Sequence, residues 1–179
     1  VIAGMGGMVV LHILQEGRDI CENVGELILQ PQSDIRLVRK YLREQGYRIT
    51  HENIINEEGK FYPMMRAVPL PTDEVSVLRD RADIQENRLC TDREDTGIRK
   101  AKEYTRREQD IHKMEDRYGP RLLAGRHPVL AEYLRGEEAK LREIEARLRG
   151  QRENPGISRR LGEVSEDLLL NLQAQGFWD

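Results

Sequence analysis

The chain has 179 residues, of which 34% are charged, 38% hydrophobic and 5% aromatic, with a formal net charge of −3. This length allows one domain or one and a half, and the charge excludes a uniformly basic nucleic-acid binder, so any such surface must be local. The two cysteines, Cys21 and Cys90, form no CxxC motif, which argues against a disulfide framework and favours the reducing cytoplasm. Apolar stretches all fall short of the roughly 20 residues of a membrane span, so we expect no membrane partner.

The first residues, 2–7, have the sequence IAGMGG and predict the end of a buried strand that runs through a glycine loop into a helix. Glycines after a strand let a ligand approach the backbone, and a helix start offers free amide donors. Val9 replaces the third glycine of the dinucleotide-binding pattern, so the loop alone does not distinguish a ligand site from a tight turn. The helix is expected from Gly7 to about Glu16, with an apolar face formed by Val10, Leu11 and Leu14.

A second strand is predicted at residues 26–30, because Leu27 to Leu29 form an unbroken apolar run typical of strands covered on both faces. It ends in Gln30 and Pro31. A side-chain amide donates and accepts at once, so Gln30 could bind the edge of a nucleobase, or it could form a local hydrogen bond at the strand end. Neighbouring strand ends with loops at their carboxyl edge are where open α/β sheets bind ligands.

A helix should follow, with Ser33 or Asp34 as its cap and Gly46 at its end. Its apolar stripe is Ile35, Val38, Tyr41 and Leu42, and the side chains expected to face water are Arg36, Arg39, Lys40 and Arg43.

Residues 47–55 and 60–68 then predict a β-hairpin. Pro63 within it indicates a sheet edge or a bulge. Phe61 and Tyr62 could stack on bases or pack on the sheet. Residues 1–70 are thus expected to form the C-terminal half of a doubly wound α/β sheet that ends in an antiparallel hairpin, with the other half upstream of Val1.

Residues 71–117 are highly charged, and we expect a linker or a loose helical insertion there. Residues 118–179 predict an α-helical hairpin, with one helix at about 128–149 and a second after the Asn154-Pro155-Gly156 break. Its arginines alternate with glutamates, which indicates either paired charges on a solvated face or phosphate contacts. The basic cluster comprises Arg135, Lys140, Arg142, Arg147, Arg149, Arg152, Arg159 and Arg160.

The four histidines, His12, His51, His112 and His127, lack metal-ligand spacing, and no Ser/His/Asp or Cys/His arrangement can be proposed. The sequence therefore predicts no metal site.

The segments IAGMGG, ILQP, Tyr41-Leu42, EEGKFY and YGP occur in an order that resembles the bacterial tRNA adenine-N1 methyltransferases of the TrmK type, which act on adenine 22 of tRNA. The resemblance spans most of 1–68 and again about 118–150. It implies a Rossmann-like class I methyltransferase domain that binds S-adenosylmethionine, followed by a helical coiled-coil domain, with tRNA as the substrate. The implied cofactor-binding residues are Gly4, Met5, Gly6 and Gly7, the implied catalytic residues Gln30 and Pro31, and the candidate RNA contacts Arg142, Arg149, Arg152 and Arg159.

Three features depart from the family pattern. Its first motif, an acidic glycine loop of the form DVGSDH, would lie before Val1, so we expect the chain as given not to bind the cofactor by itself. Pro63 stands where the family usually has an acidic residue, and segment 72–117 is longer than usual. The alternative is a non-catalytic fragment that acts only as an RNA-binding or protein-interaction module.

Overall fold

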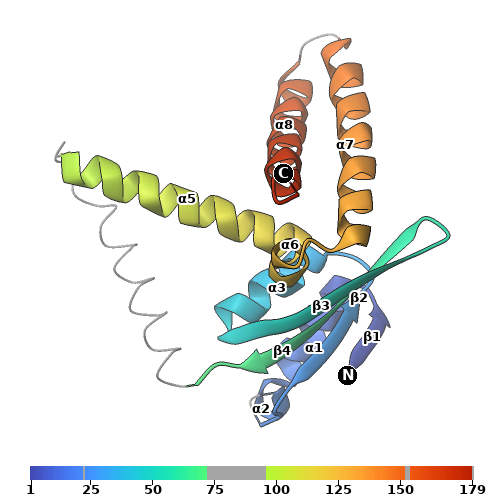
Figure 1. Cartoon of the computed structure of the whole chain (residues 1–179), viewed down its shortest axis with the longest axis vertical. Coiled ribbons are helices and arrows are strands. Elements are labelled where there is room, and N and C mark those ends of the chain that lie inside the picture. The colour runs from blue at the N-terminus through green and yellow to red at the C-terminus, as the bar shows by residue number, and fades with distance from the viewer. Residues whose placement is uncertain (22, 72–95, 152–153, 179) are drawn as a thin grey trace.

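The computed structural model describes residues 1–21, 23–71, 96–151 and 154–178. In the helix that begins at residue 96, it describes the side chains from residue 107 onward. Helices and strands follow the order that the sequence predicts for residues 1–70, with one short helix, Arg18–Cys21, that was not predicted, and three longer helices come after them (Figure 1). The elements are β1 (Ile2–Met5), α1 (Gly7–Glu16), α2 (Arg18–Cys21), β2 (Leu27–Pro31), α3 (Ile35–Glu44), β3 (Tyr47–Glu57), β4 (Lys60–Pro69), α5 (Thr96–Tyr118), α6 (Pro120–Ala124), α7 (Pro128–Arg149) and α8 (Pro155–Gln175).

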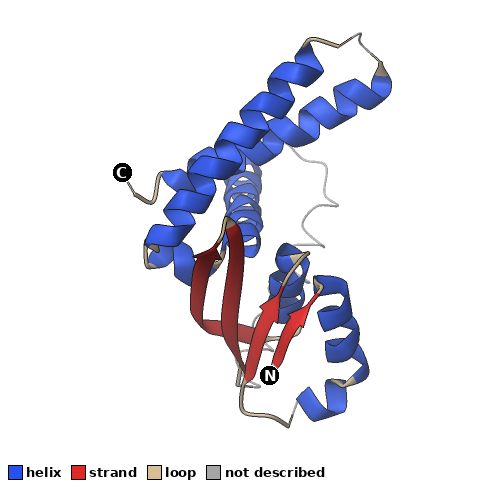
Figure 2. Ribbon diagram, turned by 90° about the vertical axis from the view of Figure 1, so that its right-hand side faces the viewer, coloured by secondary structure: helices blue, strands red, loops and turns tan. Residues whose placement is uncertain are grey.

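The four strands form one mixed sheet in the order β1-β2-β4-β3. β1 and β2 are parallel, and β4 is antiparallel to both of its neighbours. Helices α1 and α3 cover one face of this sheet (Figure 2). Apolar residues that recur at helical and strand spacing fill the space between them, and the buried members are Val10, Leu11, Leu14, Leu27, Leu29, Val38, Leu42, Met65 and Ala67.

The β3–β4 hairpin turns through Glu58 and Gly59, both in the left-handed region, with φ of 51° and 82°. Such a two-residue turn matches the twist of the strands. β2 pairs with β4 only from Ala67 to Met65, so Pro63 lies beyond that pairing, where β4 pairs with β3 alone. This position agrees with the predicted sheet edge, where a proline is tolerated.

One expectation for α3 is wrong. Arg39 was expected to face water, but only 2% of it is exposed. The reason is that β3 and the end of α5 pack over it and supply its hydrogen-bond partners. Asp34 occupies the cap position with φ of 50°, but its side chain makes no capping bond, whereas Gly46 ends the region at φ of 77° as predicted.

The expected linker 71–117 falls partly outside the described residues, since 72–95 are not described. From Thr96 onward the chain forms the single helix α5, which runs through to Tyr118 and past the expected boundary. Its C-terminal part is buried at Met114, Asp116 and Tyr118. Contacts with α3 hold this end, so the charged composition of the segment does not prevent order there.

Helices α7 and α8 lie side by side and antiparallel, and we call them the helical pair (Figure 1). Asn171 Nδ2 of α8 donates to the Leu134 carbonyl oxygen at 3.1 Å near one end. Ser165 Oγ donates to Glu145 at 2.9 Å further along. Near the N-terminus of α7, Tyr133 makes an edge-to-face contact with Phe61 of β4, with 5.2 Å between ring centroids. Phe61 therefore packs between the sheet and the helical pair.

Among the described helices, none combines the length and apolar character that a membrane crossing requires.

Candidate functional site

The carboxyl ends of the parallel strands β1 and β2 lie next to each other. Met5 is in register with Pro31, and Ala3 with Gln30. The glycine loop (Gly4–Gly7) and a second loop (Gln30–Asp34) therefore meet at one edge of the sheet, as the sequence predicts. Figure 2 shows that β1 and β2 point toward the end of the sheet at which the helical pair lies.

Hydrogen bonds join the two loops. The Gly4 amide donates to Gln30 Oε1 at 2.8 Å, and the Gln32 amide donates to the Met5 carbonyl oxygen at 2.9 Å. The side-chain oxygen of Gln30 is thus used locally. The Gly4 amide is used as well.

A third contact joins the helix start to the second loop. The Gly7 amide donates to Ser33 Oγ at 3.2 Å, and Ser33 Oγ donates to Asp34 Oδ2 at 2.9 Å. A Cβ at Gly7 would lie 2.3 Å from the Ser33 carbonyl oxygen, so only glycine fits. Sequence analysis missed the role of Ser33, because a serine before a helix is more often a cap than a partner of a distant loop.

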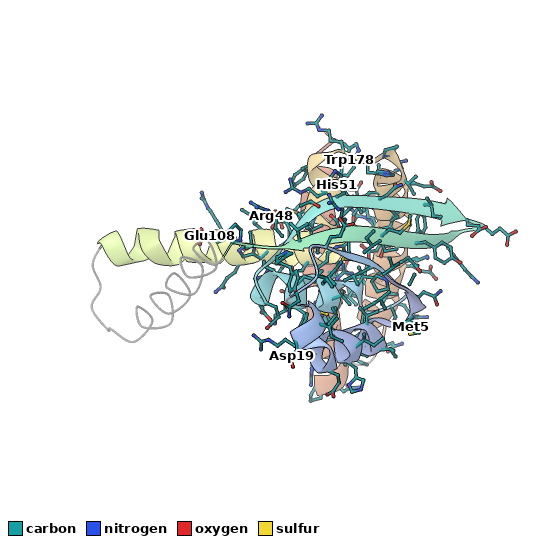
Figure 3. All side chains as sticks on the ribbon, turned by 90° about the horizontal axis from the view of Figure 1, so that it is seen from below. Met5, Asp19, Arg48, His51, Glu108 and Trp178 are labelled. Atoms are coloured by element: carbon teal, nitrogen blue, oxygen red, sulfur yellow. The ribbon has the colours of Figure 1, made fainter. Side chains whose placement is uncertain are left out.

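Open space borders the glycine loop. Gly4 has φ of 75°, and nothing lies within 4 Å of the position that its Cβ would take. Met5 and Met8 beside it are 45% and 60% exposed, and Figure 3 shows Met5 at the margin of the molecule. Bare backbone next to exposed apolar side chains suits a flat, uncharged ring that lies against the loop.

Gln30 keeps one polar function available. Its Nε2 has no hydrogen-bond partner within the part of the chain that the structure describes, while Oε1 is held by Gly4. The side chain is therefore oriented by its oxygen and can donate from its nitrogen. Pro31 is buried beside it and is the last residue of β2.

On the helical pair, three of the four candidate RNA contacts have a carboxylate partner one turn away on the same helix. Arg152 lies outside the described residues. The pairs are Arg142 with Glu138 at 2.7 Å, Arg149 with Glu145 at 2.9 Å, and Arg159 with Glu163 at 3.3 Å.

Three other members of the basic cluster are exposed on α7, namely Arg135, Lys140 and Arg147. Counting only the described residues, no side chain forms an ion pair with them. Sequence spacing did not separate them from their paired neighbours, because that difference depends on rotamers and on the facing helix.

A buried carboxylate ties the helical pair to α5. Glu137 accepts hydrogen bonds from Tyr118 (2.7 Å), Tyr133 (3.1 Å), Asn171 (2.9 Å) and Arg117 (3.1 Å). Burial by itself raises the pKa of Glu137, but the charge of Arg117 and the donated hydrogen bonds outweigh it and lower the pKa below its usual value. Burial and the Glu137 charge raise the pKa of Tyr118. Both groups thus keep their ordinary protonation at neutral pH, which indicates a structural role.

In the ranges that the structure describes, no group of three or more His, Cys, Asp or Glu side chains could hold a metal ion.

A mixed sheet with ligand loops at the carboxyl edge of parallel strands is the arrangement of Rossmann-like α/β proteins. The chain belongs to the family described as tRNA (adenine(22)-N(1))-methyltransferase, which it matches over residues 1–111. The Bacillus subtilis (strain 168) enzyme of that description is 39% identical over 66 residues, which are 37% of this chain and 28% of that relative.

Solved structures share the fold. The crystal structure of the B. subtilis m1A22 tRNA methyltransferase TrmK has a TM-score of 0.67 at 22% identity, and the match covers 97% of this chain and 61% of that one. A Streptococcus pneumoniae protein crystallised with S-adenosyl-L-methionine has a TM-score of 0.62 at 21% identity, covering 97% and 57%. The chain thus spans about 60% of the length of these structures.

Proposed function

We propose that the protein transfers a methyl group from S-adenosylmethionine to N1 of adenine 22 in tRNA. The observation that carries the proposal is the glycine loop, which is fixed by Gln30 and Ser33 at the carboxyl edge of two parallel strands. Membership of the methyltransferase family supports the reaction class.

We further infer that residues 1–70 correspond to the C-terminal half of a class I methyltransferase domain and that the helical pair corresponds to a coiled-coil domain. Two observations support this inference. The antiparallel strand β4 lies between β2 and β3 at one side of the sheet. The solved structures with the same fold are longer than this chain.

The residues at the glycine loop fit the adenosine part of the cofactor. Gly4 leaves its backbone open, and Met5 and Met8 offer apolar surface for a purine ring. When bound, S-adenosylmethionine supplies a methyl group on a positively charged sulfur. Gly7 and Ser33 would hold the loop in shape, because the contact between them leaves no room for adjustment.

Gln30 would orient the target adenine. N1 must keep its lone pair for the methyl group, so the free Nε2 of Gln30 would donate to another ring nitrogen. Pro31 would fix the backbone that carries this side chain. The reaction then requires that N1 and the methyl group be held in line, which residues that position the adenine would achieve. It would need no strong base. The adenine would leave its stack to reach this edge.

The helical pair would bind the tRNA backbone. Exposed arginines and lysines neutralise phosphates and release counterions. Arg135, Lys140 and Arg147 are the stronger candidates, because the carboxylate partners of Arg142, Arg149 and Arg159 compete with phosphate.

The test is methyl transfer by the full-length protein to an unmodified tRNA transcript, with primer-extension arrest to locate the product, since a methyl group on N1 blocks base pairing. We expect arrest at position 22 that requires both the protein and S-adenosylmethionine. A transcript with adenine 22 replaced by guanine is the control. Binding of tRNA without any methyl transfer would contradict the proposal and favour the non-catalytic RNA-binding alternative.

A further inference from the structure

A buried ion pair connects the sheet to the segment that leads into the helical pair. Arg39 of α3 and Glu52 of β3 lie 2.8 Å apart from Nε to Oε1, and their side chains are 2% and 0% exposed. Charges this deeply buried are stable only when paired and fully hydrogen-bonded. The remaining hydrogen-bond partners of Arg39 and Glu52 therefore identify the elements that this ion pair holds together.

Those partners all belong to the α5–α6 corner. Arg39 Nη1 donates to the carbonyl oxygens of Asp116 (3.2 Å) and Arg117 (3.0 Å), at the end of α5. Glu52 Oε2 accepts from the Arg121 amide at 2.9 Å, at the start of α6. The cation thus lies at the C-terminus of the long helix α5, where the helix dipole favours it. The anion accepts a backbone hydrogen bond at the start of the short helix α6.

Gly119, between α5 and α6, packs closely against the Arg39–Glu52 ion pair. Its φ is 97°, and a Cβ would lie 2.7 Å from the Glu52 carboxylate oxygens and 2.8 Å from Arg39 Nη2. We call this cluster, Arg39, Glu52, Asp116, Gly119 and Arg121, the joint. A side chain larger than hydrogen at position 119 cannot enter it without displacing a buried charge.

From the joint, the connection continues into the helical pair. Arg117 forms an ion pair with Asp167 of α8 and another, at 3.1 Å, with Glu137 of α7. Arg43 of α3 pairs with Asp116 at 2.7 Å on the sheet side. The end of α5 is therefore fixed to the sheet on one side and to both long helices on the other.

We propose that Arg39 and Glu52 are positioning residues for the methyl transfer, because they set the angle between the helical pair and the carboxyl edge of the sheet. This inference rests on the proposed function. tRNA bound along the helices and an adenine at the glycine loop can be engaged together only at one relative orientation. Figures 1 and 2 show that the helical pair lies at the end of the sheet toward which β1 and β2 point.

The experiment compares Glu52→Gln with Glu44→Gln, which removes the same charge from an exposed pair with Lys40 on α3. Spin labels at the exposed positions Gln15 of α1 and Glu143 of α7 report the orientation, in a background with Cys21 and Cys90 replaced by serine. Tm, tRNA binding, S-adenosylmethionine binding and methyl transfer are measured on the same variants, each made in the full-length protein.

We expect Glu52→Gln to broaden the distance distribution between the labels and to slow methyl transfer about tenfold or more, because small misplacements are costly. Its affinities for tRNA and the cofactor should stay within about twofold of the parent, because neither surface contains Glu52. Glu44→Gln should change none of these quantities.

An unchanged distance distribution in Glu52→Gln would overturn the inference, and so would a broadened distribution with an unchanged rate. If the parent protein transfers no methyl group, the proposed function fails, while the distance measurement still tests the joint. Should Glu52→Gln not fold, Arg43→Gln loosens the same contact at a half-exposed pair, and a smaller change in the same direction is expected.

Discussion

The core beneath the sheet and the joint at its end differ in composition. Nine buried residues between the sheet and helices α1 and α3 are all apolar. The joint instead buries Arg39 and Asp116, and the base of the helical pair buries Asn171. Apolar contacts are non-directional and tolerate small rotations, whereas paired charges and hydrogen bonds require particular geometry. The first region makes the sheet stable, and the second fixes where the helices stand.

Arg39→Ala should have the largest effect on stability. It leaves Glu52 buried without its ion-pair partner, and removing one member of a buried pair costs about 3–5 kcal/mol. Urea denaturation measures the change. Arg36→Ala, on the exposed side of the same helix, should cost about 1 kcal/mol or less. If both variants lost the same free energy of unfolding, the buried charges of the joint would contribute no more to stability than an exposed charge.

Gly7→Ala should come next. A Cβ at 2.3 Å from a backbone oxygen forces the two loops apart, and overpacking of this kind costs about 1–3 kcal/mol. We also expect loss of S-adenosylmethionine binding, measured by calorimetry in a protein that binds it. Gly25→Ala, with nothing within 4 Å of its Cβ, is the matched control and should leave binding intact.

Two triple variants separate the free from the paired cations of the helical pair. Replacing Arg135, Lys140 and Arg147 by Gln should weaken tRNA binding and lower its salt slope by roughly 0.7–0.9 for each lost phosphate contact. Replacing Arg142, Arg149 and Arg159 changes the net charge equally. It should have the smaller effect, because these three arginines are already paired with glutamates and so make fewer phosphate contacts. Filter binding at several salt concentrations decides, and the reverse order would place the RNA surface on the paired face.

Acid should weaken the base of the helical pair through Glu137. Its pKa in the folded state is below the unfolded value of about 4.3. The stabilisation is therefore complete above that pH and is lost as pH falls toward the folded pKa. Glu137→Gln should flatten the pH dependence of Tm in this range, while Glu143→Gln, exposed on the same helix, should keep it. A slope unchanged in Glu137→Gln would mean that other carboxylates dominate.

The smallest effects on stability should have opposite signs in helix α8 and in the β3–β4 turn. Gly162→Ala, in the middle of α8 with open space around it, should stabilise the protein by about 0.5–1 kcal/mol. Gly59→Ala should destabilise it by about 1 kcal/mol, because the turn holds φ at 82°. Thermal denaturation of the two variants measures both, and equal signs would contradict this account of the hairpin turn.

The elements of residues 1–70 and α7 were predictable from the sequence because their signals are local. Apolar spacing defined α1 and α3, the turn at Glu58-Gly59 defined the hairpin, and a proline and a glycine bracket α7. The meeting of the two loops was also predictable, since the carboxyl ends of neighbouring parallel strands share one edge. The family resemblance, carried by motifs in that same part of the chain, is confirmed.

The partners of polar side chains were decided only by the tertiary structure. Arg39 lies on a helix among other basic residues, and nothing nearby in sequence distinguishes it from Arg36. Its carbonyl partners are 77 and 78 residues away. The hydrogen bond between Gly7 and Ser33, which are 26 residues apart, could not be predicted from the sequence either. Periodicity reports which face of an element is apolar, but a buried hydrogen bond depends on the distance and angle between groups far apart in the chain, and these exist only once the chain has folded.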